Sequence, residues 1–136
     1  MADARHTRYC APVSYLIVFL GGGIGAVLRH GVNRAALAML GVGFPFGTFI
    51  VNVAGSYVMG VLAALFLANG IGEHSARLFL ATGVLGGFTT FSAFSLDAGV
   101  MWQRGEWITL AIYVVGSVLC SIAALFLGIA SGRALA

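Results

Sequence analysis

Four long apolar stretches follow one another along the 136-residue chain, separated by short polar or glycine- and proline-containing connections. They run from about residue 13 into the thirties, and then over about residues 47–68, 76–101 and 107–129. A helix of roughly 20 apolar residues crosses the hydrocarbon core of a bilayer. The pattern therefore predicts an all-α membrane protein, with a short polar N-terminal tail (residues 1–12) and a single four-helix transmembrane domain (residues 13–132).

Composition leaves no room for a soluble domain. Hydrophobic residues make up 60% of the chain and charged residues only 8%, whereas soluble domains carry roughly 25% charged residues. The basic residues are scattered, so no basic stripe indicates a nucleic-acid partner. The sequence shows neither a nucleophile–base pair nor a metal cluster, which argues against an enzyme. Any function must be built from the helices themselves, with membrane lipid around them.

The distribution of arginines gives almost no preferred orientation in the membrane. If the chain crosses four times, four arginines flank the spans on one side and three on the other. The first group is Arg5, Arg8, Arg77 and Arg133, and the second is Arg29, Arg34 and Arg104. A chain that inserts both ways up can close into an antiparallel pair with a two-fold axis in the membrane plane. We therefore predict an antiparallel, dual-topology homodimer.

The third apolar stretch contains a segment that is poorly suited to an uninterrupted helix, GVLGGFTTFSAFSLDAG (residues 83–99). Gly86 and Gly87 favour a break in the helix. Irregular backbone at membrane depth is tolerated only where it is buried in protein or lines a cavity. Hydroxyl side chains can satisfy the freed backbone groups, and the segment offers four: Thr89, Thr90, Ser92 and Ser95.

A broken helix in this position favours the binding of ions. Its free carbonyl groups attract cations, and its free N–H groups attract anions. Phe91 and Phe94 lie three residues apart, on one side of the second half-helix. The edge of a phenyl ring carries positive potential. Hydroxyl and amide donors together with ring edges suit a small anion, so we expect Thr90, Phe91, Ser92, Phe94 and Ser95 along an anion pathway.

Two other stretches carry polar residues at helical spacing. Asn52 lies one turn after Thr48 and one turn before Ser56, which places all three on one face. The amide of Asn52 suits either an ion path or a hydrogen bond between helices. In the fourth stretch, a hydroxyl stripe suits either a lined path or bonds to carbonyls of the same helix. The stripe consists of Tyr113, Ser117 and Ser121.

Two charged residues lie close to the predicted spans. Arg29 stands where the first helix is expected to end, so it either reaches the lipid head groups or supplies positive potential at a pore mouth. Asp97 lies near the end of the third helix and is the only acidic residue within a span. No carboxylate is expected deep in the bundle.

These motifs resemble those of the Fluc (CrcB) fluoride channels, and they cover nearly the whole chain after the first dozen residues. The matching segments are GGGIGAVLRHG, GTFIVNVAGSYVMG, GVLGGFTTFSAFS and the stripe of one tyrosine and two serines. The resemblance implies a homodimer in the inner membrane of a bacterium. It also implies that fluoride leaves the cell passively through two antiparallel pores, which relieves fluoride toxicity.

The resemblance further implies roles for individual residues. The backbone carbonyls of Gly86 and Thr89 would hold a central structural sodium ion that is not transported. Phe91 and Phe94 would face the pores, and Arg29 would lie in the vestibule. The polar track would comprise Asn52, Tyr113, Ser117 and Ser121. The chain departs from the family pattern at Phe88, where an aliphatic residue is expected, and at Asp97, where relatives often have glutamate.

Other classes of protein remain open as alternatives. A small multidrug-type transporter also has four spans and an antiparallel dimer. It requires a membrane-embedded carboxylate, usually in the first helix, and the first apolar stretch here has none. An enzyme acting within the membrane and a purely structural membrane subunit are the remaining alternatives.

Overall fold

The computed structural model describes residues 6–68 and 74–136, all of them in helices or short connections. The elements are α1 (His6–Leu40), α2 (Phe46–Ala68), α3 (His74–Arg77), the π-helical segment η1 (Leu78–Leu85), α4 (Gly86–Phe88), α5 (Phe91–Gln103) and α6 (Trp107–Leu135). They provide four segments long and apolar enough to cross a membrane, and α3 to α5 together make the third. The predicted all-α fold with four spans is confirmed.

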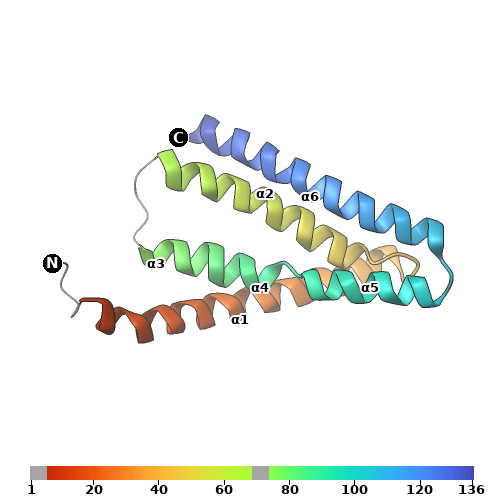
Figure 1. The fold of residues 1–136 in the computed structure, drawn as a ribbon, viewed down its shortest axis with the longest axis horizontal. Coiled ribbons are helices and arrows are strands. Elements are labelled where there is room, and N and C mark those ends of the chain that lie inside the picture. The colour runs from red at the N-terminus through yellow and green to blue at the C-terminus, as the bar shows by residue number, and fades with distance from the viewer. Residues whose placement is uncertain (1–5, 69–73) are drawn as a thin grey trace.

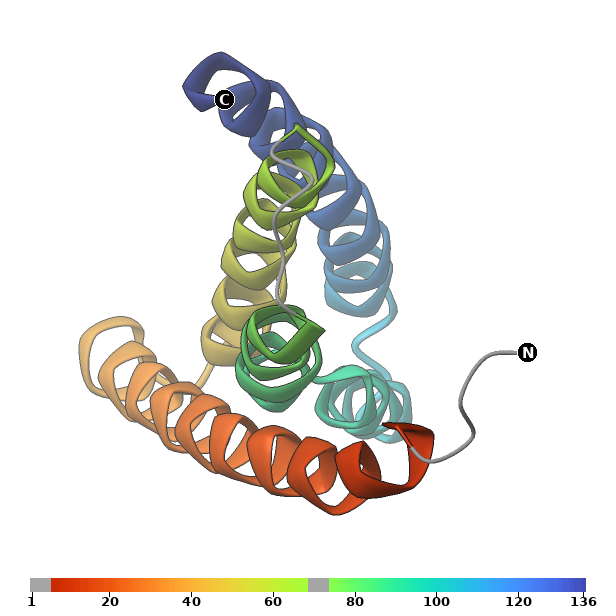
Figure 2. The same cartoon turned by 90° about the vertical axis from the view of Figure 1, so that its left-hand side faces the viewer.

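The helices form two pairs (Figure 1). α2 lies beside α6 and runs in the same direction, while α1 lies along the third span and packs mainly against η1 and α4. Viewed from the end of the molecule, α1 crosses beneath the other helices at an angle (Figure 2). The first turn of α1 and the last turn of α6 lie at the same end of the bundle (Figure 1). This is the arrangement expected for an even number of spans.

The first helix is longer than the sequence indicated. It begins at His6 and includes Pro12, whereas we expected a tail up to residue 12; residues 1–5 of that tail lie outside the described part. The part of this helix that is long and apolar enough to cross a membrane begins at Pro12, so residues 6–11 extend the span as helix. The helix stops at Leu40, where Gly41 has φ +79° and its N–H donates to the Leu37 carbonyl at 3.1 Å. A glycine in this left-handed conformation is a common helix end.

Glycines set the distance between α1 and the third span. A methyl group added at Gly21 would approach the Phe79 carbonyl to 2.7 Å, and Gly83 lies against the Cα atom of Gly21. Further along, Gly25 faces the Val84 carbonyl and Gly87 faces the Gly22 carbonyl. These backbones touch directly, without side chains between them. Gly21 and Gly25 of the first apolar stretch therefore serve helix packing, as small residues commonly do in membranes.

The pairing of α2 with α6 also depends on glycines. Gly60 faces the Leu125 carbonyl, Gly128 faces the Tyr57 carbonyl, and Gly132 lies against Val61. This direct contact fixes the register of the two helices. Together with the interface between α1 and the third span, it leaves a space near the middle of the bundle where backbones do not meet.

The third span breaks at Thr89 and Thr90, just after the glycine pair. Gly86 and Gly87 are helical, and the backbone becomes extended only at Thr89 (φ −78°, ψ 159°) and Thr90 (φ −154°, ψ 115°). The expected break is present, but the glycines do not form it. Gly87 instead allows the close approach to α1, and Gly86 has no atom nearer than 3.9 Å to an added methyl group.

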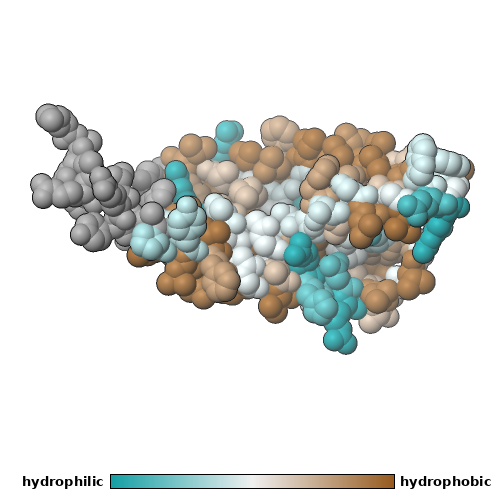
Figure 3. Space-filling view, turned by 60° about the horizontal axis from the view of Figure 1, so that its bottom comes forward, coloured by the Kyte–Doolittle hydropathy of each residue, from teal (hydrophilic) through white to brown (hydrophobic). Residues whose placement is uncertain are grey.

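Much of the outer surface is apolar (Figure 3). Large hydrophobic side chains are exposed on every span, as suits a protein surrounded by lipid. Inside, Phe94, Met101 and Tyr113 form a small core with Phe44 packed against it. At the turn between α5 and α6, Trp102 and Trp107 meet edge to face, with ring centroids 4.3 Å apart.

Candidate functional site

The break in the third span is held by one side chain from another helix. Asn52 on α2 accepts a hydrogen bond from the Thr90 N–H at 2.8 Å and donates to the Thr90 carbonyl at 3.0 Å. Both backbone polar groups of Thr90 are thereby satisfied, as irregular backbone at membrane depth requires. The amide of Asn52 therefore makes the hydrogen bond between helices, which was one of the two roles expected for it. One Nδ2–H bond of the amide is left for another acceptor.

The two hydrogen bonds between the Asn52 side chain and the Thr90 backbone form a clamp. The clamp changes the partners of two nearby carbonyls. In a continuous helix the Thr90 N–H would bind the Gly86 carbonyl, and the Ala93 N–H would bind the Thr89 carbonyl. Here Asn52 takes the first N–H, and the Thr90 hydroxyl accepts the second at 3.1 Å. The Gly86 and Thr89 carbonyls have thus both lost their helical donors.

The other hydroxyls of the predicted segment mostly make hydrogen bonds to backbone groups. Thr90 caps the N-terminus of α5, and its hydroxyl also lies 3.2 Å from that of Ser92. Thr89 donates to the Leu85 carbonyl and Ser95 donates to the Phe91 carbonyl, both at 3.0 Å. This agrees with the expectation that threonine and serine satisfy backbone groups around the break.

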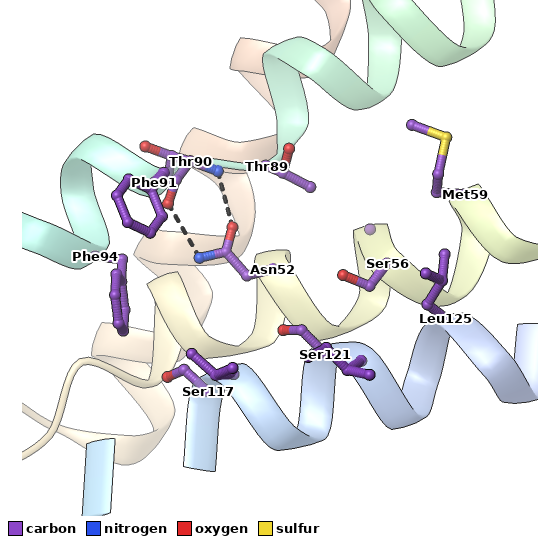
Figure 4. Close-up of a pocket in the computed structure, with 13 residues that line it drawn as sticks. Asn52, Ser56, Met59, Thr89, Thr90, Phe91, Phe94, Ser117, Ser121 and Leu125 are labelled. Atoms are coloured by element: carbon purple, nitrogen blue, oxygen red, sulfur yellow. Dashed lines mark hydrogen bonds between the residues drawn. The ribbon is translucent and has the colours of Figure 1, made fainter. Parts of the chain in front are cut away.

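A cavity of about 390 Å³ lies beside the break, between α2, α5 and α6 (Figure 4). No carboxylate and no cation occurs among the described residues that line it. The lining combines an amide, several hydroxyls, two phenyl rings and an apolar end. Its members are Asn52, Gly55, Ser56, Met59, Thr89, Thr90, Phe91, Phe94, Ser117, Val118, Ser121, Ile122 and Leu125.

The two phenylalanines both reach the cavity but differ in burial. Phe91 begins α5 and is 77% exposed, whereas Phe94 is 9% exposed. Their ring centroids lie 5.5 Å apart. Phe94 also packs on the ring of Tyr113 at 5.2 Å. Phe94 is therefore fixed by the core, while Phe91 projects from the open side of the protomer.

The predicted hydroxyl stripe on α6 divides into two parts. Ser117 and Ser121 line the cavity, and the hydroxyl of Ser117 is buried without a hydrogen-bond partner in the described structure. Tyr113 is fully buried behind Phe94 and donates to Asp97 Oδ2 at 3.1 Å. The stripe divides because each four-residue step turns a helix by about 40° beyond a full turn. Asp97, whose role was left open, is thus a partner of Tyr113.

The remaining predicted residues lie away from the cavity. Arg29 is half-buried in the middle of α1, eleven residues before Leu40, and α1 supplies no residue to the lining. The expectation that Arg29 marks the helix end is wrong, because the apolar run after it continues the helix. Gly86 is exposed on the surface of the protomer.

Sequence reasoning did not place several lining residues at the site. Gly55 faces the methyl group of Thr89, so it makes room for the extended backbone. Ser56 lies one turn beyond Asn52, and this spacing is a signal that could have placed it at the site. The apolar residues Met59, Val118, Ile122 and Leu125 carry no distinguishing signal within such hydrophobic helices.

Comparison with known proteins agrees with this architecture. The model of the family described as CrcB-like protein, Camphor Resistance (CrcB), matches residues 16–129. A protein of Rhodopseudomonas palustris named fluoride-specific ion channel FluC is 53% identical over 123 residues, covering 90% of this chain and 99% of that protein. A protein of the same name from Methylobacterium nodulans is 55% identical over 108 residues, covering 79% and 86%.

A third relative, fluoride-specific ion channel FluC 2 of Nitrobacter hamburgensis, is 50% identical over 121 residues, covering 89% of this chain and 98% of its own. All three relatives are named as channels, which are not enzymes. The family model covers all four spans, the break and most of α6. This chain therefore belongs to the CrcB family.

Proposed function

We propose that this protein is a fluoride channel, through which fluoride leaves the cell down its electrochemical gradient. The observation that carries the proposal is the cavity beside the break, whose described lining offers hydroxyl and amide donors and no carboxylate. The names of the relatives point to the same ion. The bacterial origin of these relatives and the four apolar spans support a place in the inner membrane of a bacterium.

The chemistry of the lining fits a small, strongly hydrated anion. Fluoride gives up its hydration shell only where other donors replace it. Ser117 offers a buried hydroxyl with no partner in the described structure, and Ser121 lies one turn further along the same helix. Phe91 and Phe94 add ring edges, which carry positive potential. A lining without negative charge lets the anion approach without electrostatic repulsion.

We propose further that the Gly86 and Thr89 carbonyls hold a structural sodium ion. The clamp by Asn52 and the cap by Thr90 remove the donors that these carbonyls would have in a helix. Hard cations accept carbonyl oxygens as ligands. The ion would neutralise these dipoles where two copies of the break meet, and it would not be transported.

The functional unit in this proposal is an antiparallel homodimer. Phe91 and Gly86 are exposed on the protomer, so the cavity and the carbonyl pair both lie at its surface. A second copy would cover this face and give two pores related by the two-fold axis. The near balance of four and three arginines supports insertion in both orientations.

Efflux from liposomes tests the fluoride channel directly. Purified protein is reconstituted into vesicles loaded with fluoride, and release is followed with a fluoride electrode. We expect release without a proton or sodium gradient and a much slower release of chloride. Equal chloride and fluoride flux would contradict the choice of ion. Dependence on a proton gradient would favour the small multidrug-type transporter instead.

The sodium site has a separate test. Long equilibration in buffer that contains only a large organic cation should lower flux and dimer stability, while fluoride remains the ion that passes. Gly86→Val should disturb the dimer, although an added side chain meets nothing closely within the protomer. Undiminished flux and dimer stability in sodium-free buffer would contradict a structural cation.

A further inference from the structure

The hydroxyl groups on the membrane spans fall into two classes. Thr89, Ser95 and Ser131 each donate to the carbonyl four residues earlier in their own helix, at 2.9–3.0 Å. This is the usual way in which a hydroxyl is satisfied within a membrane helix. A second class makes no hydrogen bond in the described part of the chain, and it includes Ser56, Ser117 and Ser121.

Of these hydroxyls, Ser56, Ser117 and Ser121 line one cavity, whereas Thr82 and Thr109 lie outside it. The distribution of the three serines over the helices is uneven, because Ser117 and Ser121 lie on α6 whereas Ser56 lies on α2. Figure 4 places Ser56 across from Ser121, between Asn52 and the apolar end of the cavity formed by Met59 and Leu125. The three serine hydroxyls therefore border one space from two sides.

The register of the helices determines the order of these groups along the cavity. α2 and α6 run in the same direction (Figure 1), and Gly128 faces the backbone between Tyr57 and Val61. In this register, Ser56 stands beyond Ser121, and about three residues of axial rise, or roughly 4–5 Å, separate the two levels. The donors thus follow one another along the cavity, from Ser117 to Ser121 and then to Ser56.

We propose that Ser56 is a further ion-contacting residue of the anion path, and that its hydroxyl donates to the ion where the path leaves the serines of α6. The inference rests on the proposed fluoride conduction and adds a donor from α2 to it. Beyond Ser56 the described lining continues with Met59 and Leu125, which offer no hydrogen-bond donor. Without Ser56, the only donor that α2 offers to an anion near Ser121 is the remaining amide N–H of Asn52, one turn earlier on that helix.

The Ser56 hydroxyl makes no hydrogen bond to its own helix, so it is free to bind an ion. A serine that donates to its own helix must break that bond before it can solvate an ion. Ser56 makes no such bond to the Asn52 carbonyl, although it has the same four-residue spacing as Ser95 and Ser131 to their acceptors. Its donor is available without cost, as preorganised ion solvation requires.

Fluoride efflux from liposomes tests the proposal with Ser56→Ala, Ser56→Thr and the matched control Ser131→Ala. We expect Ser56→Ala to reduce fluoride efflux roughly tenfold or more, the loss expected for one hydrogen bond to a charged group. Ser56→Thr should restore a large part of the flux because it returns a hydroxyl. Ser131→Ala should keep the wild-type flux, since its hydroxyl lies outside the cavity, where it donates to the Leu127 carbonyl and accepts from the Tyr57 hydroxyl.

Thermal unfolding and gel filtration of the same samples separate a role in conduction from a role in packing. Ser56→Ala should keep the melting temperature and dimer size of the wild type. Equal efflux from Ser56→Ala and the wild type would overturn the proposal, as would a flux loss that only follows loss of the dimer. A wild-type protein that releases no fluoride would instead overturn the proposed function itself.

Discussion

The two interfaces of the third span are built on opposite principles. Its first half meets α1 backbone to backbone, with Gly83 and Gly87 against Gly21 and Gly22. Its second half faces α2 and α6 across the cavity, and the contact is made by polar side chains and phenyl rings. The same apolar stretch thus forms a close-packed contact with α1 before Thr89, which we call the glycine seam. After Thr89 it borders an open space lined with hydrogen-bond donors.

This difference shows how a small membrane protein creates a polar cavity between its helices. Direct backbone contact anchors one half-helix firmly, because close packing is the main attraction between helices in lipid. The anchored half then carries a break whose polar groups are satisfied by a single residue, Asn52. Four further experiments test this contrast.

The largest loss of stability is expected from adding a side chain at the glycine seam between α1 and the third span. Gly87→Val places a branched side chain against the Gly22 carbonyl, a backbone atom that cannot move aside. Overpacking typically costs about 1–3 kcal/mol, and we expect at least the upper value here because the obstacle is backbone. We expect little assembled protein, measured by gel filtration and thermal unfolding in detergent. Gly23→Val is the matched control, because nothing lies within 4 Å of a side chain added there. Equal stability of the two variants would show that α1 and the third span can move apart without loss of stability.

The next effect comes from removing the clamp. Asn52→Ala leaves the N–H and carbonyl of Thr90 without partners, and each unpaired group costs about 1–3 kcal/mol. We expect a lower melting temperature and a fluoride flux reduced by more than tenfold. Asn33→Ala is the control, because Asn33 lies in a span but makes no hydrogen bond in the described structure. A stable, fully active Asn52→Ala protein would mean that the break holds without its clamp.

The clamp also shows where sequence reasoning reached its limit. Four spans, a break in the third and the importance of Asn52 follow from hydropathy and from polar residues in apolar surroundings. The position of the break does not, because it depends on a hydrogen-bonded pair that joins residues 38 positions apart. Local propensity favours the glycines, but the glycines are used to approach α1.

The site was predictable to a similar extent. The spacing of Ser117 and Ser121 correctly places both on one face, and both line the cavity. Tyr113 shares the spacing but has turned away from that face and bonds to Asp97. Each four-residue step turns the helix by about 40° beyond a full turn, so Tyr113 and Ser121 point about 80° apart. Only the packing of α5 on α6 shows which side of the stripe is open.

A third experiment sharpens the contrast within the cavity by comparing its two rings. Phe91→Ile removes an exposed ring, whereas Phe94→Ile removes one that packs on Tyr113. Both should reduce fluoride flux several-fold, because isoleucine has no positive ring edge. Only Phe94→Ile should also lower stability, by about 1–2 kcal/mol. Efflux and thermal unfolding are measured on the same samples. Unchanged flux in both variants would assign the rings to packing alone.

The smallest effect is expected at the edge of the site. Tyr113→Phe keeps the buried ring and removes the hydroxyl that bonds to Asp97 and Thr48. The cost should be about 1 kcal/mol of stability. Because Tyr113 lies behind Phe94, flux should stay within about fivefold of the wild type, the factor that corresponds to about 1 kcal/mol. Ser117→Ala, at the cavity itself, should reduce flux more strongly. Abolition of flux by Tyr113→Phe would place the tyrosine hydroxyl in the path.

The clamp has a consequence for how the protein is made. A chain entering the bilayer must satisfy every backbone group within the segment being inserted. The third span cannot satisfy its own backbone with Thr89 and Thr90 extended, because the hydrogen-bond partner of Thr90 lies on the second span. During biosynthesis it must therefore enter as a continuous helix and open only when it meets α2. The break is a product of helix association, and a nascent third span alone has no means of forming it.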